Sequence, residues 1–98
     1  MSSVTKRYRV SEYGDEYQIE YEQSDGSYII YCWEHPDNPY SDKVTDCHLY
    51  SDGRVCIREG REPTTLDRAI AIAKVWMNGY SHYVRTGTFG ATGGRVNV

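Results

Sequence analysis

One amphipathic stretch near the end of the chain, residues 64–86, constrains the fold more than any other feature of the sequence. Its apolar side chains recur at helical spacing over about five turns. These side chains are Leu66, Ala69, Ile70, Ala73, Trp76, Met77, Tyr80, Tyr83 and Val84. No second stretch of this 98-residue chain has the pattern, so the helix has to bury its apolar stripe against a sheet.

Both ends of this helix carry sequence signals. Thr64 is suited to cap the first turn, and Asp67 stands three residues later, where a capping box places an acid. Thr86-Gly87 predicts the end, because glycine commonly follows the last helical residue. Gly79 lies inside the stripe and costs about 1 kcal/mol relative to alanine, which indicates close packing or a bend.

The first third of the chain predicts strands. Residues 7–10 form a short run, and residues 16–23 alternate so that Tyr17, Ile19 and Tyr21 share one face. A Ser-Asp-Gly turn of the kind that tight hairpins prefer follows at residues 24–26. Residues 27–33 are apolar on both faces, which predicts a central strand covered by the helix.

The middle of the chain is less regular. Residues 34–46 include Pro36 and Pro39 with several Asp and Asn residues, which predicts an ordered irregular loop. Residues 47–57 predict a small hairpin or two short extended pieces. We therefore expect an α+β fold, an antiparallel β-meander of about four strands packed against one long C-terminal helix. Residues 1–89 form the single domain, and residues 90–98 form a flexible glycine-rich tail.

Charge and hydropathy limit the binding partners and the cellular location that can be expected for the chain. The net charge is −3 and the basic residues are scattered, which disfavours nucleic acid, although tyrosines interleaved with arginines can stack on bases. No apolar run approaches the roughly 18–20 residues that span a bilayer, and residues 1–6 lack the apolar segment of a secretory signal. We expect a cytoplasmic protein without membrane contact, whose three cysteines stay reduced.

Cys56 is the candidate nucleophile. It follows a turn and precedes a polar stretch, with Arg54 and Arg58 two residues to either side. Neighbouring cations and a nearby helix N-terminus both favour the thiolate. His48 lies across the turn, close enough to be a neighbour. The alternative, which the residues alone leave open, is that Cys56 is a small buried hydrophobe between Val55 and Ile57.

The surroundings of Cys56 resemble a known family. Residues 48–57, HLYSDGRVCI, are similar to the active-site stretch of ubiquitin-conjugating enzymes, and most similar to the bacterial branch, which often reads His-x-Tyr-x-Asp-Gly-x-x-Cys. The likeness continues to Thr64-Thr65-Leu66, which opens a helix, and to Thr86-Gly87 followed by an aromatic residue. Upstream, residues 27–34 and the proline-containing loop fit the same fold. The resemblance covers roughly residues 16–89.

This resemblance implies a transferase that works by thioester exchange. Cys56 would accept the C-terminal acyl group of a ubiquitin-like protein from an adenylating activating enzyme and pass it to an amine of a protein target. His48 stands at the position of the family's supporting asparagine, with Asp46 and Cys47 in place of its His and Pro. A histidine there can donate a hydrogen bond to the oxyanion or act as a base. The alternative for His48 is a structural hydrogen bond that pins the turn. No cofactor is implied.

The sequence also departs from that family. It contains neither the N-terminal helix that helps to dock the activating enzyme nor the helices that follow the active-site helix. Three interpretations follow: a minimal active enzyme, one component of a larger conjugation assembly, or a catalytically inactive protein-interaction module. Such a module would use the tyrosine-rich sheet or the loop 36–40 as its contact surface.

A metal site is a further alternative for the same cysteines. Cys32, Cys47, His48 and Cys56 have ligand types that zinc accepts. Their spacing is unlike that of structural zinc sites, and adjacent residues on a strand point apart. We therefore predict no metal.

Overall fold

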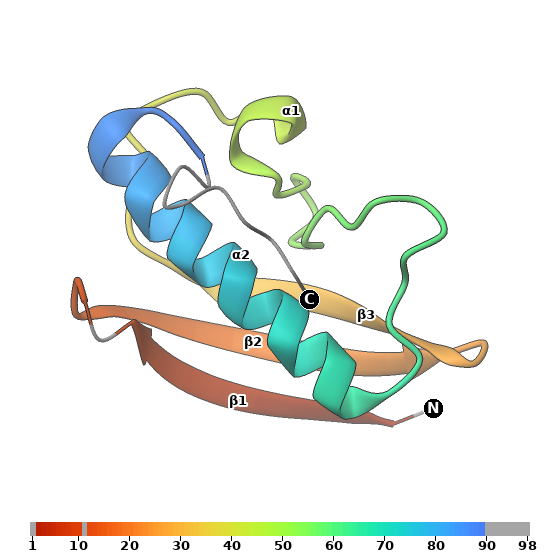
Figure 1. Cartoon of the computed structure of the whole chain (residues 1–98). Coiled ribbons are helices and arrows are strands. Elements are labelled where there is room, and N and C mark those ends of the chain that lie inside the picture. Colours follow the sequence, from red (N-terminus) through yellow and green to blue (C-terminus); the bar gives the residue numbers. More distant parts are fainter. Residues whose placement is uncertain (1, 11, 90–98) are drawn as a thin grey trace.

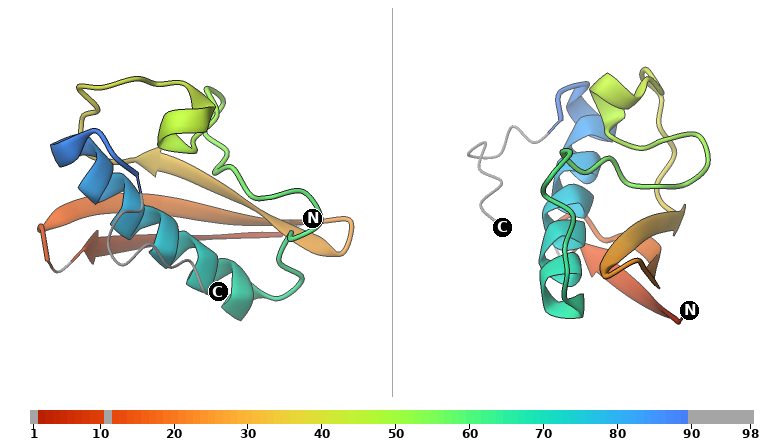
Figure 2. Two further views of the ribbon diagram at one scale, coloured as in Figure 1. Left: turned by 45° about the horizontal axis from the view of Figure 1, so that its top comes forward. Right: turned by 90° about the vertical axis from the view of Figure 1, so that its right-hand side faces the viewer.

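The computed structural model describes residues 2–10 and 12–89, and the predicted tail, residues 90–98, lies outside this part. Three strands, β1 (Ser3–Val10), β2 (Asp15–Ser24) and β3 (Ser27–Glu34), come first. A short helix, α1 (Val44–Cys47), and a long helix, α2 (Leu66–Thr86), follow. The strands form one antiparallel sheet in the order β1-β2-β3, and α2 lies across one face of it (Figures 1 and 2). The α+β class and the packing of one long helix on a meander are thus confirmed.

The turn between β2 and β3 is the one that the sequence predicted. Asp25 and Gly26 have φ angles of 52° and 81°. Two successive positive φ values are required by the tight turn whose twist matches that of a hairpin, and Asp-Gly tolerates them. Strand pairing begins directly beside the turn, at Ser24 and Ser27.

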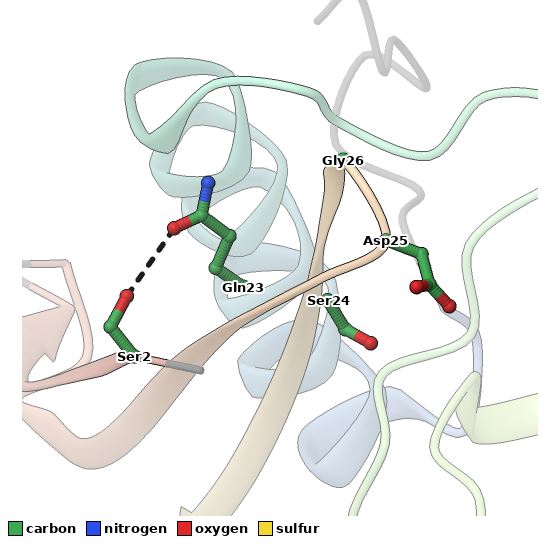
Figure 3. A pocket seen from close by; sticks show the side chains of 5 residues that line it. All are labelled: Ser2, Gln23, Ser24, Asp25 and Gly26. Carbon is green, nitrogen blue, oxygen red and sulfur yellow. Dashed lines mark hydrogen bonds between the residues drawn. The ribbon is translucent and has the colours of Figure 1, made fainter.

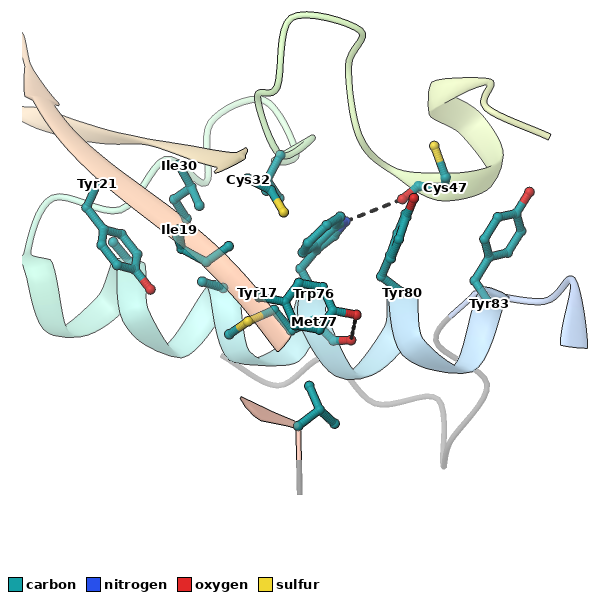
Figure 4. Packing of buried hydrophobic residues seen from close by; sticks show 14 residues of the cluster. Tyr17, Ile19, Tyr21, Ile30, Cys32, Cys47, Trp76, Met77, Tyr80 and Tyr83 are labelled. Carbon is teal, nitrogen blue, oxygen red and sulfur yellow. Dashed lines mark hydrogen bonds between the residues drawn. The ribbon is translucent and has the colours of Figure 1, made fainter. Parts of the chain in front are cut away.

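The alternation in β2 places Tyr17, Ile19 and Tyr21 in the core under α2, as predicted (Figure 4). β2 is the central strand, because β1 pairs with one of its edges and β3 with the other. The prediction that β3 is central is therefore wrong. β3 buries Ile30 and Cys32 on the helix side. The side chains on its other face are half-buried or exposed: Ile29, Tyr31 and Trp33.

The expected fourth strand does not form within the described residues. The segment after α1 makes only two isolated bridges, Leu49 with Val55 and Tyr31 with Arg54. Two hydrogen bonds join it to β3, from the Cys32 N–H to the Gly53 carbonyl and from the Val55 N–H to the Ile30 carbonyl, both 2.8 Å long. The left-handed backbone at His48 and a tight turn that ends at Gly53 leave too few extended residues for a ladder. The segment therefore covers the edge of β3 without becoming a strand.

α2 begins one residue later than the sequence predicted. Thr65, rather than Thr64, is the N-cap, and its hydroxyl accepts a 3.2 Å hydrogen bond from the Arg68 N–H. The capping box with Asp67 is therefore wrong. The Pro63 carbonyl accepts a hydrogen bond from the Tyr28 N–H, which ties residue 63 to the sheet and delays the first turn. The end of α2 at Thr86 is confirmed, since Gly87 has a φ of 81° and its N–H bonds to the Tyr83 carbonyl.

α2 has one buried face and one solvent face. The buried face includes Ala69, Ala73, Trp76 and Tyr80, whereas Lys74 lies on the exposed side. Within residues 2–10 and 12–89, no helix combines the length and the apolar character that crossing a membrane requires.

Candidate functional site

Cys56 lies directly after the bridge that covers the edge of β3. Its neighbour Val55 is buried in the core, whereas Cys56 itself is only partly buried. The Cys56 N–H donates a 2.9 Å hydrogen bond to the His48 carbonyl. The backbone thus brings the two predicted site residues together across the turn.

The other two cysteines lie in the core. Cys32 and Cys47 are each 3% exposed. Burial raises the pKa of Cys32 to about 12. The Cys32 thiol donates a 3.3 Å hydrogen bond to the Glu34 carbonyl. Burial also raises the pKa of Cys47. Because the thiolate is the reactive form, Cys56 is the cysteine best placed to act as a nucleophile.

His48 ends α1 in a left-handed conformation, with a φ of 58°, and its N–H bonds to the Val44 carbonyl. Its imidazole packs on the Phe89 ring, with centroids 4.5 Å apart. Burial lowers the pKa of His48 below the ordinary 6.5, and the Asp46 carboxylate opposes this shift. The imidazole is therefore mainly neutral at pH 7, a form that can accept a proton. The His48 carbonyl accepts the Cys56 N–H, but this is a main-chain bond that any residue at position 48 would supply, so it assigns no role to the imidazole.

Tyr50 is a third member of the site, one to which the sequence analysis gave no role. Interaction with the Cys56 side chain is the largest cause of the raised pKa of the Tyr50 phenol. The Tyr50 side chain is exposed, and the Arg54 guanidinium lies 4.6 Å from its ring centroid. The available signal was the tyrosine of the His-x-Tyr-x-Asp-Gly-x-x-Cys pattern, which Tyr50 matches.

The electrostatic support expected for a Cys56 thiolate is only partly present. Arg54 forms a 2.9 Å ion pair with Asp52, which offsets its charge, and Arg58 is exposed. The N-terminus of α2 lies next to the β2–β3 hairpin, through the bond between Tyr28 and Pro63. The end of α1, by contrast, is tied to the middle of α2, where the Trp76 indole N–H donates a 3.3 Å hydrogen bond to the Cys47 carbonyl (Figure 4). The expected contribution of the α2 N-terminus to Cys56 is thus without support.

A polar hollow of about 450 Å³ lies elsewhere, at the β2–β3 hairpin (Figure 3). Ser2, Gln23, Ser24, Asp25 and Gly26 line it. None of the predicted site residues lines it, and its lining residues include one carboxylate and no hydrophobic residue. We assign it no role.

The cysteines do not assemble a metal site. Among residues 2–10 and 12–89, no three His, Cys, Asp or Glu side chains converge in a way that would hold an ion. Cys47 and Cys56 also face different surroundings, since one is in the core and the other is partly open to solvent.

Comparison of the chain with protein-family models, with curated proteins and with solved structures returned no match. The resemblance to ubiquitin-conjugating enzymes stays a prediction.

Proposed function

We propose that this chain is a thioester-forming carrier of the ubiquitin-conjugating type. Cys56 is its nucleophile, and His48 and Tyr50 support it. The partners are a ubiquitin-like protein, its adenylating activating enzyme and a protein target. The proposed location is the cytoplasm, where a reducing environment keeps thiols free.

The contrast among the three thiols carries this proposal. Two cysteines are buried in the core with raised pKa values, whereas the one inside the family-like motif is only partly buried. That cysteine also has a phenol beside it and a backbone bond to His48. A buried structural cysteine would lack the access to solvent that a nucleophile needs.

The reaction would run in two steps. The Cys56 sulfur forms a thioester with the C-terminal carbonyl carbon of the modifier, and the group that held this carbonyl on the activating enzyme leaves. A target amine then attacks the thioester, an amide forms, and the Cys56 thiol is released. The neutral His48 can take the proton of the amine, and the Tyr50 hydroxyl is a donor for the oxyanion.

The test is a thioester assay. The chain is incubated with an activating enzyme, its ubiquitin-like protein and ATP, and the products are separated on a non-reducing gel. A dithiothreitol-sensitive adduct that Cys56→Ala abolishes and Cys32→Ala retains supports the carrier. Cys32→Ala is the matched control, because this substitution also removes one thiol but at a buried position outside the site.

Two results would contradict the assignment. One is an adduct that persists in Cys56→Ala. The other is iodoacetamide labelling of Cys32 or Cys47 in the folded protein while Cys56 stays unmodified.

A binding module is the second candidate, and one surface favours it. Trp33 is 49% exposed and stacks on Tyr31, with ring centroids 5.1 Å apart. The Trp33 indole N–H donates to Glu20, and the Tyr31 hydroxyl donates to Glu22. Neither glutamate has a cationic partner within the described residues. Aromatic rings beside unpaired carboxylates suit a partner segment that presents lysine or arginine.

A fluorescence titration separates this candidate from the carrier. A lysine-rich peptide should quench Trp33 in a Trp76→Phe background, and a glutamate-rich peptide of equal length should not. Trp33→Ala should remove binding while Cys56→Ala retains it. Equal affinity for both peptides would end the charge-based argument.

A further inference from the structure

Phe89 folds back from the end of α2 and fills a notch in the helix. A Cβ atom placed on Gly79 would lie 2.5 Å from the Phe89 ring, closer than such atoms approach. The backbone of Gly79 is ordinary α-helix. Glycine is therefore required at this position because a side chain would collide with Phe89, and not because of the backbone conformation. Of the two alternatives predicted for Gly79, close packing or a bend, the contact with Phe89 supports close packing.

The Phe89 ring contacts His48 as well as Gly79. The centroids of the Phe89 and His48 rings are 4.5 Å apart, at an interplanar angle of 56°. Phe89 thus connects the middle of α2 to the imidazole of the residue whose carbonyl binds the Cys56 amide. Residues far apart in the sequence meet at this one ring.

The turn that delivers Phe89 is held by several contacts of its own. Gly87 has a φ of 81°, and a Cβ there would lie 3.2 Å from the Tyr40 ring. The Thr88 N–H donates to the Thr86 hydroxyl, and the Thr88 carbonyl accepts from the His82 ring. These contacts fix the direction in which the chain leaves α2, so Phe89 is aimed back at the helix.

We propose that Phe89 is a positioning residue of the Cys56 site, which sits in the Gly79 notch and holds the His48 imidazole in one orientation. Its benefit to acyl transfer rests on the proposed function, whereas the seating of the imidazole does not. An aromatic wall on one side of a partly buried ring restricts its rotation and excludes water from that side. A base held in one geometry is more effective than one that samples several.

Two variants remove the wall in different ways. Phe89→Ala deletes the ring, and Gly79→Ala expels it with a methyl group on a helix that alanine favours. Asn78→Ala is the matched control, because it also adds an alanine to α2 but lies next to the notch, on the exposed side. Helix content and thermal unfolding establish that each variant is folded.

The readout is the NMR spectrum of the His48 ring in the complete chain. Loss of the Phe89 ring current should shift the His48 ring protons by several tenths of a ppm in Phe89→Ala and in Gly79→Ala, and not in Asn78→Ala. The pKa of His48 should rise toward 6.5 in the first two variants, with Asp46 as the nearby charged group that also acts on it. Unchanged His48 resonances in both notch variants would overturn the proposal.

Thioester discharge to free lysine then tests the consequence for the reaction. We expect Phe89→Ala and Gly79→Ala to discharge about five- to tenfold more slowly, with Phe89→Tyr restoring most of the rate. A discharge rate that does not change while the His48 resonances move would overturn the positioning role in the reaction. If the wild-type chain forms no thioester, the proposed carrier function is contradicted, whereas the NMR evidence that Phe89 orients the His48 imidazole still holds.

Discussion

The core under α2 and the segment that carries Cys56 are held in place by different means. In the core, large side chains from β2 and α2 bury each other: Tyr17 lies edge-on to Trp76, with ring centroids 6.0 Å apart, and both are almost fully buried. In the segment, two isolated bridges and single backbone hydrogen bonds decide the position of Cys56. Apolar burial is strong and insensitive to direction, whereas a few hydrogen bonds are weak but directional. Stability is therefore expected to depend on the core, and reactivity on the segment.

The largest effect should come from Trp76, which belongs to both regions. Trp76→Ala removes a buried ring and the N–H that holds the Cys47 carbonyl, so we expect a loss of about 3–5 kcal/mol in the free energy of unfolding. Trp76→Phe keeps most of the ring and should lose about 1–2 kcal/mol. Urea unfolding monitored by circular dichroism measures both. A loss below about 1 kcal/mol in Trp76→Ala would mean that the core is not the main source of stability.

The difference between the two regions should next appear in the reactivity of their thiols. We expect iodoacetamide at pH 8 to modify Cys56 on the order of 100-fold faster than Cys32, because Cys32 is buried and its pKa is raised to about 12. Peptide mass spectrometry of a time course measures the two rates. In urea the rates should converge, which separates the effect of the fold from that of the local sequence. Similar rates in the folded state would remove the distinction on which the proposed function rests.

The same substitution, tyrosine to phenylalanine, can be made in both regions, so that each variant loses one hydroxyl group. The Tyr17 hydroxyl is buried and bonds to Ser81 at 2.6 Å and to the Met77 carbonyl at 3.1 Å. Tyr17→Phe leaves the buried Ser81 hydroxyl without that partner and should cost about 1–2 kcal/mol of unfolding free energy. Tyr50→Phe removes an exposed hydroxyl beside Cys56 and should leave stability unchanged while slowing thioester discharge. The reverse outcome, a stability loss confined to Tyr50→Phe, would contradict the division between the regions.

The smallest expected effect is the loss of unfolding free energy at low pH that comes from the ion pair between Arg85 and Asp15. Arg85 binds Asp15 through two hydrogen bonds and lowers the pKa of that carboxyl below 3.8. A lowered folded-state pKa means that this contribution is fully present above pH 3.8 and is lost as the pH falls through the folded value. Because Arg85 is partly exposed, we expect less than about 1 kcal/mol. Asp15→Asn should reduce stability at pH 7 and converge with wild type near pH 2, as measured by urea unfolding at the two pH values.

The core was predictable because its signals are local. The period of two in residues 16–23 and the helical period after residue 64 each follow from which face is buried, and the structure buries those faces. The helix end at Gly87 and the turn at Asp25-Gly26 were also predictable, since only a few residue types accept a positive φ. The central position of β3 was mispredicted because apolar residues on both faces do not reveal that one face keeps Tyr31 and Trp33 at the surface.

The site was predictable only in part. His48 and Cys56 were selected as neighbours, and the bond from the Cys56 N–H to the His48 carbonyl confirms their proximity. No local pattern could reveal that this contact is made by the backbone, or that the His48 ring faces Phe89. The start of α2 shifted by one residue for a similar reason, because a contact between Pro63 and Tyr28 lies outside any helix signal.

The sequence by itself determined the α+β class and the buried faces of β2 and α2. Those properties depend on periodicity and on the backbone preferences of single residues. The tertiary structure decided that Cys32 and Cys47 are buried while Cys56 is partly exposed, and that Phe89 joins Gly79 to His48. These facts depend on contacts between residues distant in the chain, whose geometry is set only when α2 packs on the sheet.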